Sequence, residues 1–191
     1  MENLKLQIND LSVAYTPEKL AVKHVTTGIL ERTITAIMGP SGCGKSTLLK
    51  KLCGQDVAAC GTLALGAGLI VSYVPQDASF LHGGARDYAR NAGVDETMFL
   101  TLLRKLGFER VQFEKDMADY SAGQKKKVLL ARSLCESAHL YLWDEPLNYI
   151  DVLSRMQIEQ LLLDYRPTML FVEHDAGFCR RIATKTIRLD G

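Results

Sequence analysis

Residues 39–47 combine glycines, a lysine and hydroxyl side chains at a spacing that can bind phosphate. The stretch fits the pattern G-x-x-x-x-G-K-[ST], with Gly39, Gly44, Lys45 and Ser46 at its fixed positions. In such a loop the backbone N–H groups converge on one anion, the lysine reaches the β- and γ-phosphates, and the hydroxyl holds Mg²⁺. A plain glycine-rich turn is the alternative, but the strand pattern before the loop and the helical pattern after it favour phosphate binding.

Acidic and imidazole side chains follow two further apolar runs. Asp144 and Glu145 come after residues 140–143, and His174 comes after residues 169–172. Because the carboxyl ends of parallel strands meet at one edge of a sheet, we expect these side chains to lie beside the phosphate loop. Asp144 can hold Mg²⁺, Glu145 can polarise a water that attacks the γ-phosphate, and His174 can contact phosphate or water. A solvated acidic pair and a structural histidine are the alternatives.

The part of the chain that precedes the phosphate loop is rich in strand patterns. Apolar and polar residues alternate over 4–9 and again over 11–15, and residues 20–30 predict a further strand or two with a break near Gly28. Residues 33–38 predict a buried strand. After the loop, apolar runs alternate with helical patterns, which indicates a mainly parallel sheet. We therefore predict an α/β fold with a parallel core and an N-terminal antiparallel β subdomain.

Helical patterns dominate residues 86–136, which we predict to form a short inserted arm. Residues 86–117 are predicted to be mostly helical, with Asp95 as a candidate N-cap and an apolar face of Phe99, Leu102, Leu103 and Leu106. A second helix over 121–136, capped by Ser121, carries three lysines in its first turns, Lys125, Lys126 and Lys127. Because lysines there oppose the helix dipole, an anionic neighbour is one interpretation, but a solvated charged face is preferred.

Beyond the arm the chain returns to alternating strands and helices. Residues 151–163 predict an amphipathic helix. Its apolar face, or the edge of that face, would hold Val152, Met156, Leu161 and Leu162. A short helix and a last strand over 186–189 complete the pattern.

The chain of 191 residues is long enough for one domain with a sizeable core. Hydrophobic residues make up 47% and charged residues 24%, and the formal net charge is +1, so the overall charge gives no indication of nucleic-acid binding. The five cysteines include no C-x-x-C pair, so the sequence suggests neither a zinc site nor a disulfide framework. No signal-peptide pattern and no apolar run approaching about eighteen residues is present, and we expect a cytoplasmic protein.

Together, and in their order along the chain, the motifs resemble those of ATP-binding cassette (ABC) ATPase domains. The resemblance covers nearly the whole chain, so we expect a single domain over residues 1–191 with the P-loop cassette fold. Residues 1–85 and 137–191 would form the nucleotide-binding core. Residues 86–136 would form the helical arm, which includes the helix of the signature motif.

The resemblance implies which residues bind ATP. Tyr15 matches the aromatic residue that stacks on adenine, and residues 147–151 match the D-loop, in which Asp151 would contribute to the nucleotide site. Residues 39–47 match the Walker A motif, whose residues here are Gly39, Pro40, Ser41, Gly42, Cys43, Gly44, Lys45, Ser46 and Thr47. All of these except the proline would line the nucleotide.

The resemblance also implies a catalytic set. Residues 140–145 match the Walker B motif and the glutamate that follows it, and Gln76 matches the Q-loop glutamine. His174 matches the switch histidine of ABC proteins. Catalysis would therefore use Glu145, His174 and Gln76. The metal Mg²⁺ would be held by Ser46, Gln76 and Asp144.

Residues 120–124 match the signature motif, usually written LSGGQ, with Tyr120 and Ala122 in place of its leucine and first glycine. Two ABC cassettes pair head to tail, and ATP lies between the Walker A motif of one and the signature motif of the other. The partner would be a second cassette, identical or different, and a lone monomer should bind ATP but hydrolyse it poorly. The residues that would serve the ATP of that partner are Ser121, Gly123 and Gln124.

The sequence is similar to two branches of the family. Residues 121–128, 143–151 and 171–175 resemble the ABC-F class, whose tandem-cassette members act on ribosomes. Residues 39–45 are more similar to an importer ATPase subunit, which would dock on an integral membrane transporter subunit. The expected location is therefore the ribosome or the inner face of the membrane. A nucleotide-binding module without turnover is a third alternative.

Overall fold

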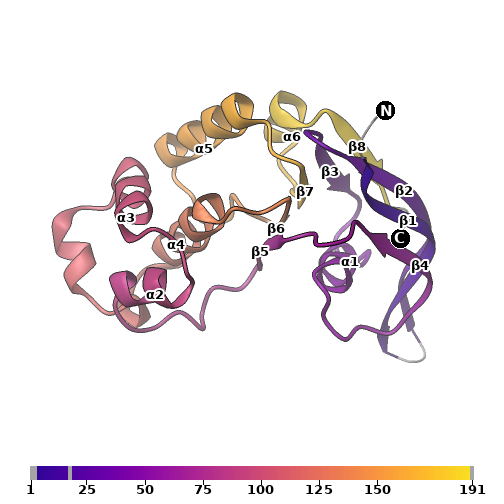
Figure 1. Cartoon of the computed structure of the whole chain (residues 1–191), viewed down its shortest axis with the longest axis horizontal. Coiled ribbons are helices and arrows are strands. Elements are labelled where there is room, and N and C mark those ends of the chain that lie inside the picture. Colours follow the sequence, from indigo (N-terminus) through magenta and orange to yellow (C-terminus); the bar gives the residue numbers. More distant parts are fainter. Residues whose placement is uncertain (1–3, 17–18, 190–191) are drawn as a thin grey trace.

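The computed structural model describes residues 4–16 and 19–189, which form two sheets and the helices around them (Figure 1). The antiparallel sheet has the order β2-β1-β4 and consists of β1 (Leu4–Thr16), β2 (Lys19–Leu30) and β4 (Ala59–Leu65). The parallel sheet has the order β5-β6-β7-β3-β8. Its strands are β3 (Ile34–Met38), β5 (Val71–Val74), β6 (Leu140–Asp144), β7 (Met169–Val172) and β8 (Lys185–Arg188). This architecture confirms the predicted α/β fold with its parallel core and antiparallel N-terminal sheet.

Strand β1 contains both of the alternating patterns that the sequence shows before residue 16. Its register with β2 shifts between Ile8 and Leu11, and Asp10 between them has a φ of 50°. Such a bulge lets one continuous strand change the face on which its apolar residues lie. Strand β2 also continues through Gly28, which pairs with Gln7. The predicted break near Gly28 was therefore wrong.

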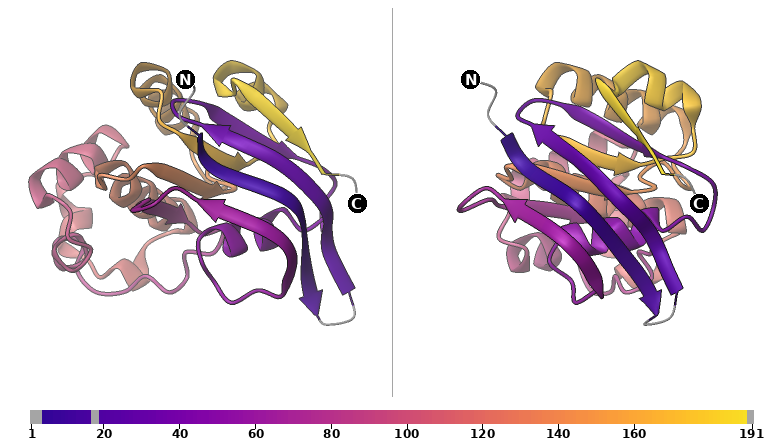
Figure 2. Two further views of the ribbon diagram at one scale, coloured as in Figure 1. Left: turned by 45° about the vertical axis from the view of Figure 1, so that its right-hand side comes forward. Right: turned by 90° about the vertical axis from the view of Figure 1, so that its right-hand side faces the viewer.

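Helix α1 (Lys45–Leu52) packs between the two sheets. Its residues Leu48 and Leu52 are buried in one cluster with Leu6 of β1 and Leu170 of β7. Figure 2 shows the antiparallel sheet as a layer across one side of the molecule. The phosphate loop before α1 is therefore fixed from both sides, because the helix that it begins is anchored in this cluster.

Strands β6 and β7 are buried on both faces. Leu170 and Val172 face the cluster around α1, whereas Met169 and Phe171 belong to a second cluster on the opposite face. The helices that contribute to that second cluster include α4 (Ala122–Cys135), α5 (Val152–Tyr165) and α6 (Ala176–Ile182). Because both faces are covered, β7 has a continuous apolar sequence rather than an alternating one.

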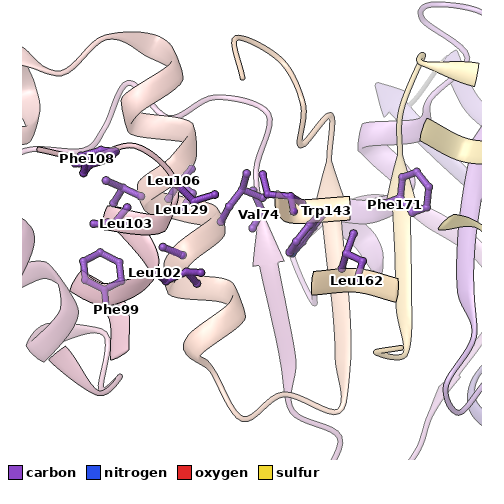
Figure 3. Packing of buried hydrophobic residues seen from close by; sticks show 14 of the residues in the cluster. Val74, Phe99, Leu102, Leu103, Leu106, Phe108, Leu129, Trp143, Leu162 and Phe171 are labelled. Atoms are coloured by element: carbon purple, nitrogen blue, oxygen red, sulfur yellow. The ribbon is translucent and has the colours of Figure 1, made fainter. Parts of the chain in front are cut away.

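The arm consists of α2 (Ala85–Asn91), α3 (Glu96–Lys105) and α4, with 3₁₀ turns η1 (Arg110–Glu114) and η2 (Met117–Asp119) before α4. Residues 86–117 are mostly helical, as predicted, but the last α-helix before α4 ends at Lys105 and only 3₁₀ turns follow it. Gly107, with a φ of 85°, follows the last turn, and such a left-handed glycine commonly ends a helix. The expected apolar face is buried, and Figure 3 shows it continuing from Phe99 to Trp143 and Phe171 of the core.

Helix α5 buries only part of the predicted face: Leu162 is in the core and Leu161 packs against it, but the other two predicted residues are exposed. Val152 and Met156 are 72% and 60% exposed, whereas Ile158 and Leu162 are buried. The buried stripe runs through Ser154, Ile158 and Leu162 at intervals of one helical turn, so tertiary packing selected a narrower face than the apolar composition suggested. Among the described residues, no helix is both long enough and apolar enough to cross a membrane.

Candidate active site

The phosphate loop joins β3 to α1 and ends at a glycine that the fold requires. Gly44 is the N-cap of α1 and has a φ of 85°. A Cβ atom on it would lie 2.6 Å from the backbone oxygen of Ala21 in β2. The loop is thus pressed against the antiparallel sheet, with the first N–H groups of α1 next to it. A helix N-terminus in this position is suited to bind an anion.

Lys45 lies inside the loop rather than in solvent. It is 5% exposed, and its Nζ donates to the backbone oxygens of Gly39 at 2.9 Å and Pro40 at 2.7 Å. The side chain of Cys43 is also buried, with its Sγ 3.6 Å from Lys45 Nζ. Of the other predicted residues, Ser41 and Gly42 are exposed on the loop, and Thr47 lies partly buried in α1.

The predicted metal ligands Ser46 and Asp144 are in contact. Ser46 Oγ donates to Asp144 Oδ1 at 3.0 Å, and Asp144 is 1% exposed. Burial raises the pKa of Asp144, and the hydrogen bond from Ser46 acts in the opposite direction. A hydroxyl and a carboxylate are the hard oxygen donors that Mg²⁺ prefers, and it usually completes its shell with water and substrate phosphates. In the described part of the chain no three His, Cys, Asp or Glu side chains form a metal-binding group. The hydroxyl of Ser46 and the carboxylate of Asp144 fit Mg²⁺ whose other ligands are water and phosphate oxygens.

Three loops meet at the carboxylate of Glu145. Its Oε2 accepts hydrogen bonds from Gln76 Nε2 at 2.8 Å and from Asn148 Nδ2. Its Oε1 lies 3.2 Å from Nε2 of His174. These partners follow β5, β6 and β7, so the structure brings the predicted catalytic residues together. Glu145 itself has a φ of 47°, and its backbone N–H donates to the oxygen of Val172 at 3.0 Å.

Two residues of this centre were missed by the sequence analysis. Asn148 is a donor to Glu145, and its position three residues after Glu145 in the D-loop was the available signal. Glu173 is buried and accepts from the backbone N–H of Leu147 at 3.2 Å and of His174 at 2.7 Å. It thereby ties the D-loop to the loop after β7. A carboxylate directly before the histidine could have been singled out.

Two of the three lysines at the start of α4, Lys126 and Lys127, are buried, so the preferred interpretation of a solvated charged face was wrong for them. Lys126 is 2% exposed and donates to the backbone oxygens of Pro75 at 2.9 Å, Gln76 at 3.1 Å and Asp144 at 3.2 Å. Burial lowers the pKa of Lys126 to about 8, although the nearby Asp144 opposes that shift. Lys127 is also buried. Lys126 thus lies among neutral backbone oxygens, and the anionic neighbour that the helix dipole suggested is a carboxylate beside Lys127.

That carboxylate belongs to Asp151, which begins α5. Lys127 Nζ lies 2.6 Å from Asp151 Oδ2, and the backbone N–H of Ser154 donates to Asp151 Oδ1 at 2.9 Å. Burial tends to raise the pKa of Asp151, but the hydrogen bonds from Lys127 and Ser154 hold it well below its usual range. The described contacts of Asp151 are thus with α4 and α5, and its contact with nucleotide stays a prediction. Tyr15 lies in β1, but its side chain is outside the described part of the structure.

The signature residues form the start of α4. Ser121 and Gln124 make a capping box, in which Ser121 Oγ accepts from the Gln124 N–H at 3.2 Å and Gln124 Oε1 accepts from the Ser121 N–H at 2.9 Å. Gly123 touches the D-loop, since a Cβ there would lie 2.3 Å from the oxygen of Tyr149. A cleft of about 810 Å³ is lined by Ala122 on the arm side and by Ser46 and Asp144 on the core side.

Comparison with known proteins agrees with this arrangement. The ABC transporter family model matches residues 22–148. ATP-binding protein Uup of Caulobacter vibrioides is 33% identical over 183 residues, which cover 91% of this chain and 30% of that protein. The manganese transport system ATP-binding protein MntA of Synechocystis sp. is 27% identical over 216 residues, with 100% of this chain and 83% of that protein covered.

The fold comparison gives the same result. The dimeric structure of a bacterial ABC transporter cassette has a TM-score of 0.82 at 23% identity, with 97% of this chain and 94% of that chain covered. The chain spans 30% of the length of its relative Uup. Because the family model matches well over half of the residues and the fold agrees along nearly all of them, this chain belongs to the ABC transporter family.

Proposed function

We propose that the chain hydrolyses ATP with Mg²⁺ as cofactor and Glu145 as the general base. The observation that carries the proposal is the convergence of Gln76, Asn148 and His174 on the Glu145 carboxylate. The residue lies directly after Asp144, the candidate metal ligand, and its φ of 47° is strained for a residue with a side chain. Backbone strain of this kind persists where the surrounding structure enforces it, and it is concentrated at active sites.

Each residue would hold or move charge at a defined place. The N-terminus of α1 and Lys45 would bind the phosphates, and Ser46 Oγ and Asp144 Oδ1 would hold Mg²⁺. When bound, Mg²⁺ supplies positive charge that neutralises the phosphate oxygens. Glu145 would accept the proton of the attacking water. Oε2 already accepts from Gln76 and Asn148, whereas Oε1 has the 3.2 Å contact with His174 and a second lone pair that can accept the proton of that water.

A second cassette would complete the site. Ser121 and Gly123 lie at the start of α4 on the arm, whereas the phosphate loop precedes α1 next to the antiparallel sheet (Figure 1). This separation supports the expectation that the signature residues serve the nucleotide of a partner. The molecular mass of the Glu145→Gln variant, measured by size-exclusion chromatography with and without Mg-ATP, tests this expectation. A dimer that forms only with Mg-ATP means that the chain pairs with itself, and a persistent monomer with bound ATP means that the partner is a different cassette.

The cellular role that we propose is of the ABC-F type, with the ribosome as partner. Support comes from the ABC-F-like sequence around the signature motif, Asp144 and His174. The length of the relative Uup, of which this chain spans 30%, leaves room for a second cassette in such a protein. The runner-up is the ATPase subunit of a membrane transporter, supported by similarity to MntA over 83% of that protein. Sedimentation with purified ribosomes and with membrane vesicles, each with Mg-ATP and the Glu145→Gln chain, separates the two.

The hydrolase itself is tested by Glu145→Gln. We expect nucleotide affinity to be kept and kcat to fall by about 10²–10⁴, the usual contribution of a general base. The matched control is Glu136→Gln at the end of α4, where the carboxylate pairs with Arg132. This control should keep the wild-type kcat. Unchanged turnover in Glu145→Gln would remove Glu145 from the proposed role, and a wild-type chain that binds ATP without turnover in any pairing would favour the non-hydrolysing module.

A further inference from the structure

Lys126 is a buried cation, and its described hydrogen bonds go to backbone oxygens at the carboxyl ends of two core strands. An ammonium group has three N–H donors, and those of Lys126 have three acceptors among the described residues, the backbone oxygens of Pro75, Gln76 and Asp144. The residue itself belongs to α4 of the arm. One side chain therefore connects the signature helix with the carboxyl ends of β5 and β6.

A residue that only filled space at this position would be apolar. Its neighbours Val128, Leu129 and Leu130 are buried and apolar, and they fill the core without a charge. Burial of an ammonium is unfavourable unless hydrogen bonds compensate for the lost water. The charge of Lys126 is thus kept in the interior by the backbone oxygens, and their position is in turn fixed by the charge.

The three oxygens belong to the backbone on which the catalytic contacts depend. Gln76 donates from its side chain to Glu145 at 2.8 Å while its backbone oxygen accepts from Lys126. Asp144 is a candidate Mg²⁺ ligand, and its backbone oxygen is next to the peptide N–H of Glu145. The ammonium therefore contacts the backbone of Gln76 and the backbone oxygen directly before Glu145, the two partners of that hydrogen bond.

We propose that Lys126 is a positioning residue that couples the signature helix to the general base. This inference rests on the proposed ATP hydrolysis. Ser121, at the start of the same helix, is five positions before Lys126, about 7.5 Å along the helix axis. The start of α4 serves the nucleotide of the partner, and Lys126 serves the site of its own chain. A displacement of α4 by partner nucleotide is transmitted through Lys126 to Gln76 and Glu145.

The test compares Lys126→Met with Lys126→Arg. Methionine keeps much of the length but has no donor, whereas arginine keeps charge and donors. We expect kcat of Lys126→Met to fall by about 10- to 100-fold, because misplacement by about 1 Å can cost that much, with Mg-ATP affinity changed by less than about threefold. Lys126→Arg should recover at least half of the loss in kcat, measured on a logarithmic scale. A loss of affinity equal to that of kcat, or no recovery by arginine, would overturn the proposal.

A matched control is Lys51→Met. Lys51 of α1 also donates to a backbone oxygen, that of Val57 at 2.9 Å, but it joins no catalytic loop. Its kcat should stay within about twofold of the wild type, and an equal loss in both variants would contradict a specific role of Lys126. If Lys126→Met does not fold, Lys126→Gln replaces it, with two donors, no charge and the same expected separation of kcat from affinity.

Amide hydrogen exchange distinguishes failure of this inference from failure of the proposed function. Loss of the ammonium should speed exchange in residues 75–80 and 144–149 by about tenfold, whether or not ATP is hydrolysed. A wild type without turnover refutes the hydrolase but leaves this measurement valid. Wild-type exchange and wild-type kcat in Lys126→Met would refute the coupling while the hydrolase stands.

Discussion

Gly123→Ala should destabilise the cassette, although the same change stabilises most helices. In a helix interior, alanine is favoured over glycine by about 0.5–1 kcal/mol. At Gly123 the new Cβ would lie 2.3 Å from the backbone oxygen of Tyr149, whereas real Cβ contacts essentially never fall below 3.0 Å. The D-loop must therefore move by at least the difference, 3.0 − 2.3 = 0.7 Å.

The neighbour of Gly123 is a backbone atom, which cannot move away by a change of rotamer. Overpacking of this kind costs about 1–3 kcal/mol, so after the propensity gain we expect a net loss of about 1–2 kcal/mol. Denaturant unfolding at equilibrium measures it. Movement of the D-loop should also displace Asn148, which precedes Tyr149 and is a partner of Glu145. We therefore expect kcat to fall as well.

The chain contains a matched control for this prediction. Gly177 is the second residue of α6 as Gly123 is the second residue of α4. A Cβ at Gly177 would lie 3.0 Å from Oδ1 of Asp175, so this side-chain oxygen needs to move by only a few tenths of an ångström. Gly177→Ala should therefore change the free energy of unfolding by less than about 0.5 kcal/mol. If both variants unfold with the same free energy, the close approach of Tyr149 does not explain Gly123.

Lys45→Ala should abolish Mg-ATP binding, because it removes the one cation buried among the loop oxygens of Gly39 and Pro40; a wild-type binding isotherm by calorimetry would refute this. Asp175→Asn should reduce the loss of stability in acid. The hydrogen bond from Arg155 is the largest cause that holds the pKa of Asp175 well below its usual range, so its contribution is present above the unfolded-state pKa of about 3.9 and is lost as pH falls further. Melting temperatures from pH 7 to pH 3 should fall more for the wild type than for Asp175→Asn, since asparagine can still cap α6. Parallel curves for both proteins would contradict this.

The strand and helix patterns of the core were predictable because they are local. Buried strands such as β7 appear as apolar runs, and the face of α3 from Phe99 to Leu106 appears at helical spacing. The face of α5 was predicted only in part, for the opposite reason: Leu161 and Leu162 pack against the core, but the rest of the predicted face does not. Val152 and Met156 are apolar, as core residues usually are. The position of α6 and β7 nevertheless decided which side of the helix is covered.

Sequence by itself determined the motifs whose chemistry depends on spacing within one segment: the phosphate loop with Lys45, the Asp144–Glu145 pair and the position of His174 after a strand. Only the tertiary structure decided what each side chain contacts across segments. It placed Asn148 and Gln76 on one carboxylate and buried Lys126 among backbone oxygens at the ends of β5 and β6. The physical reason is that backbone acceptors carry no sequence signal, so a buried lysine and a solvated lysine have the same pattern until the fold supplies the partners.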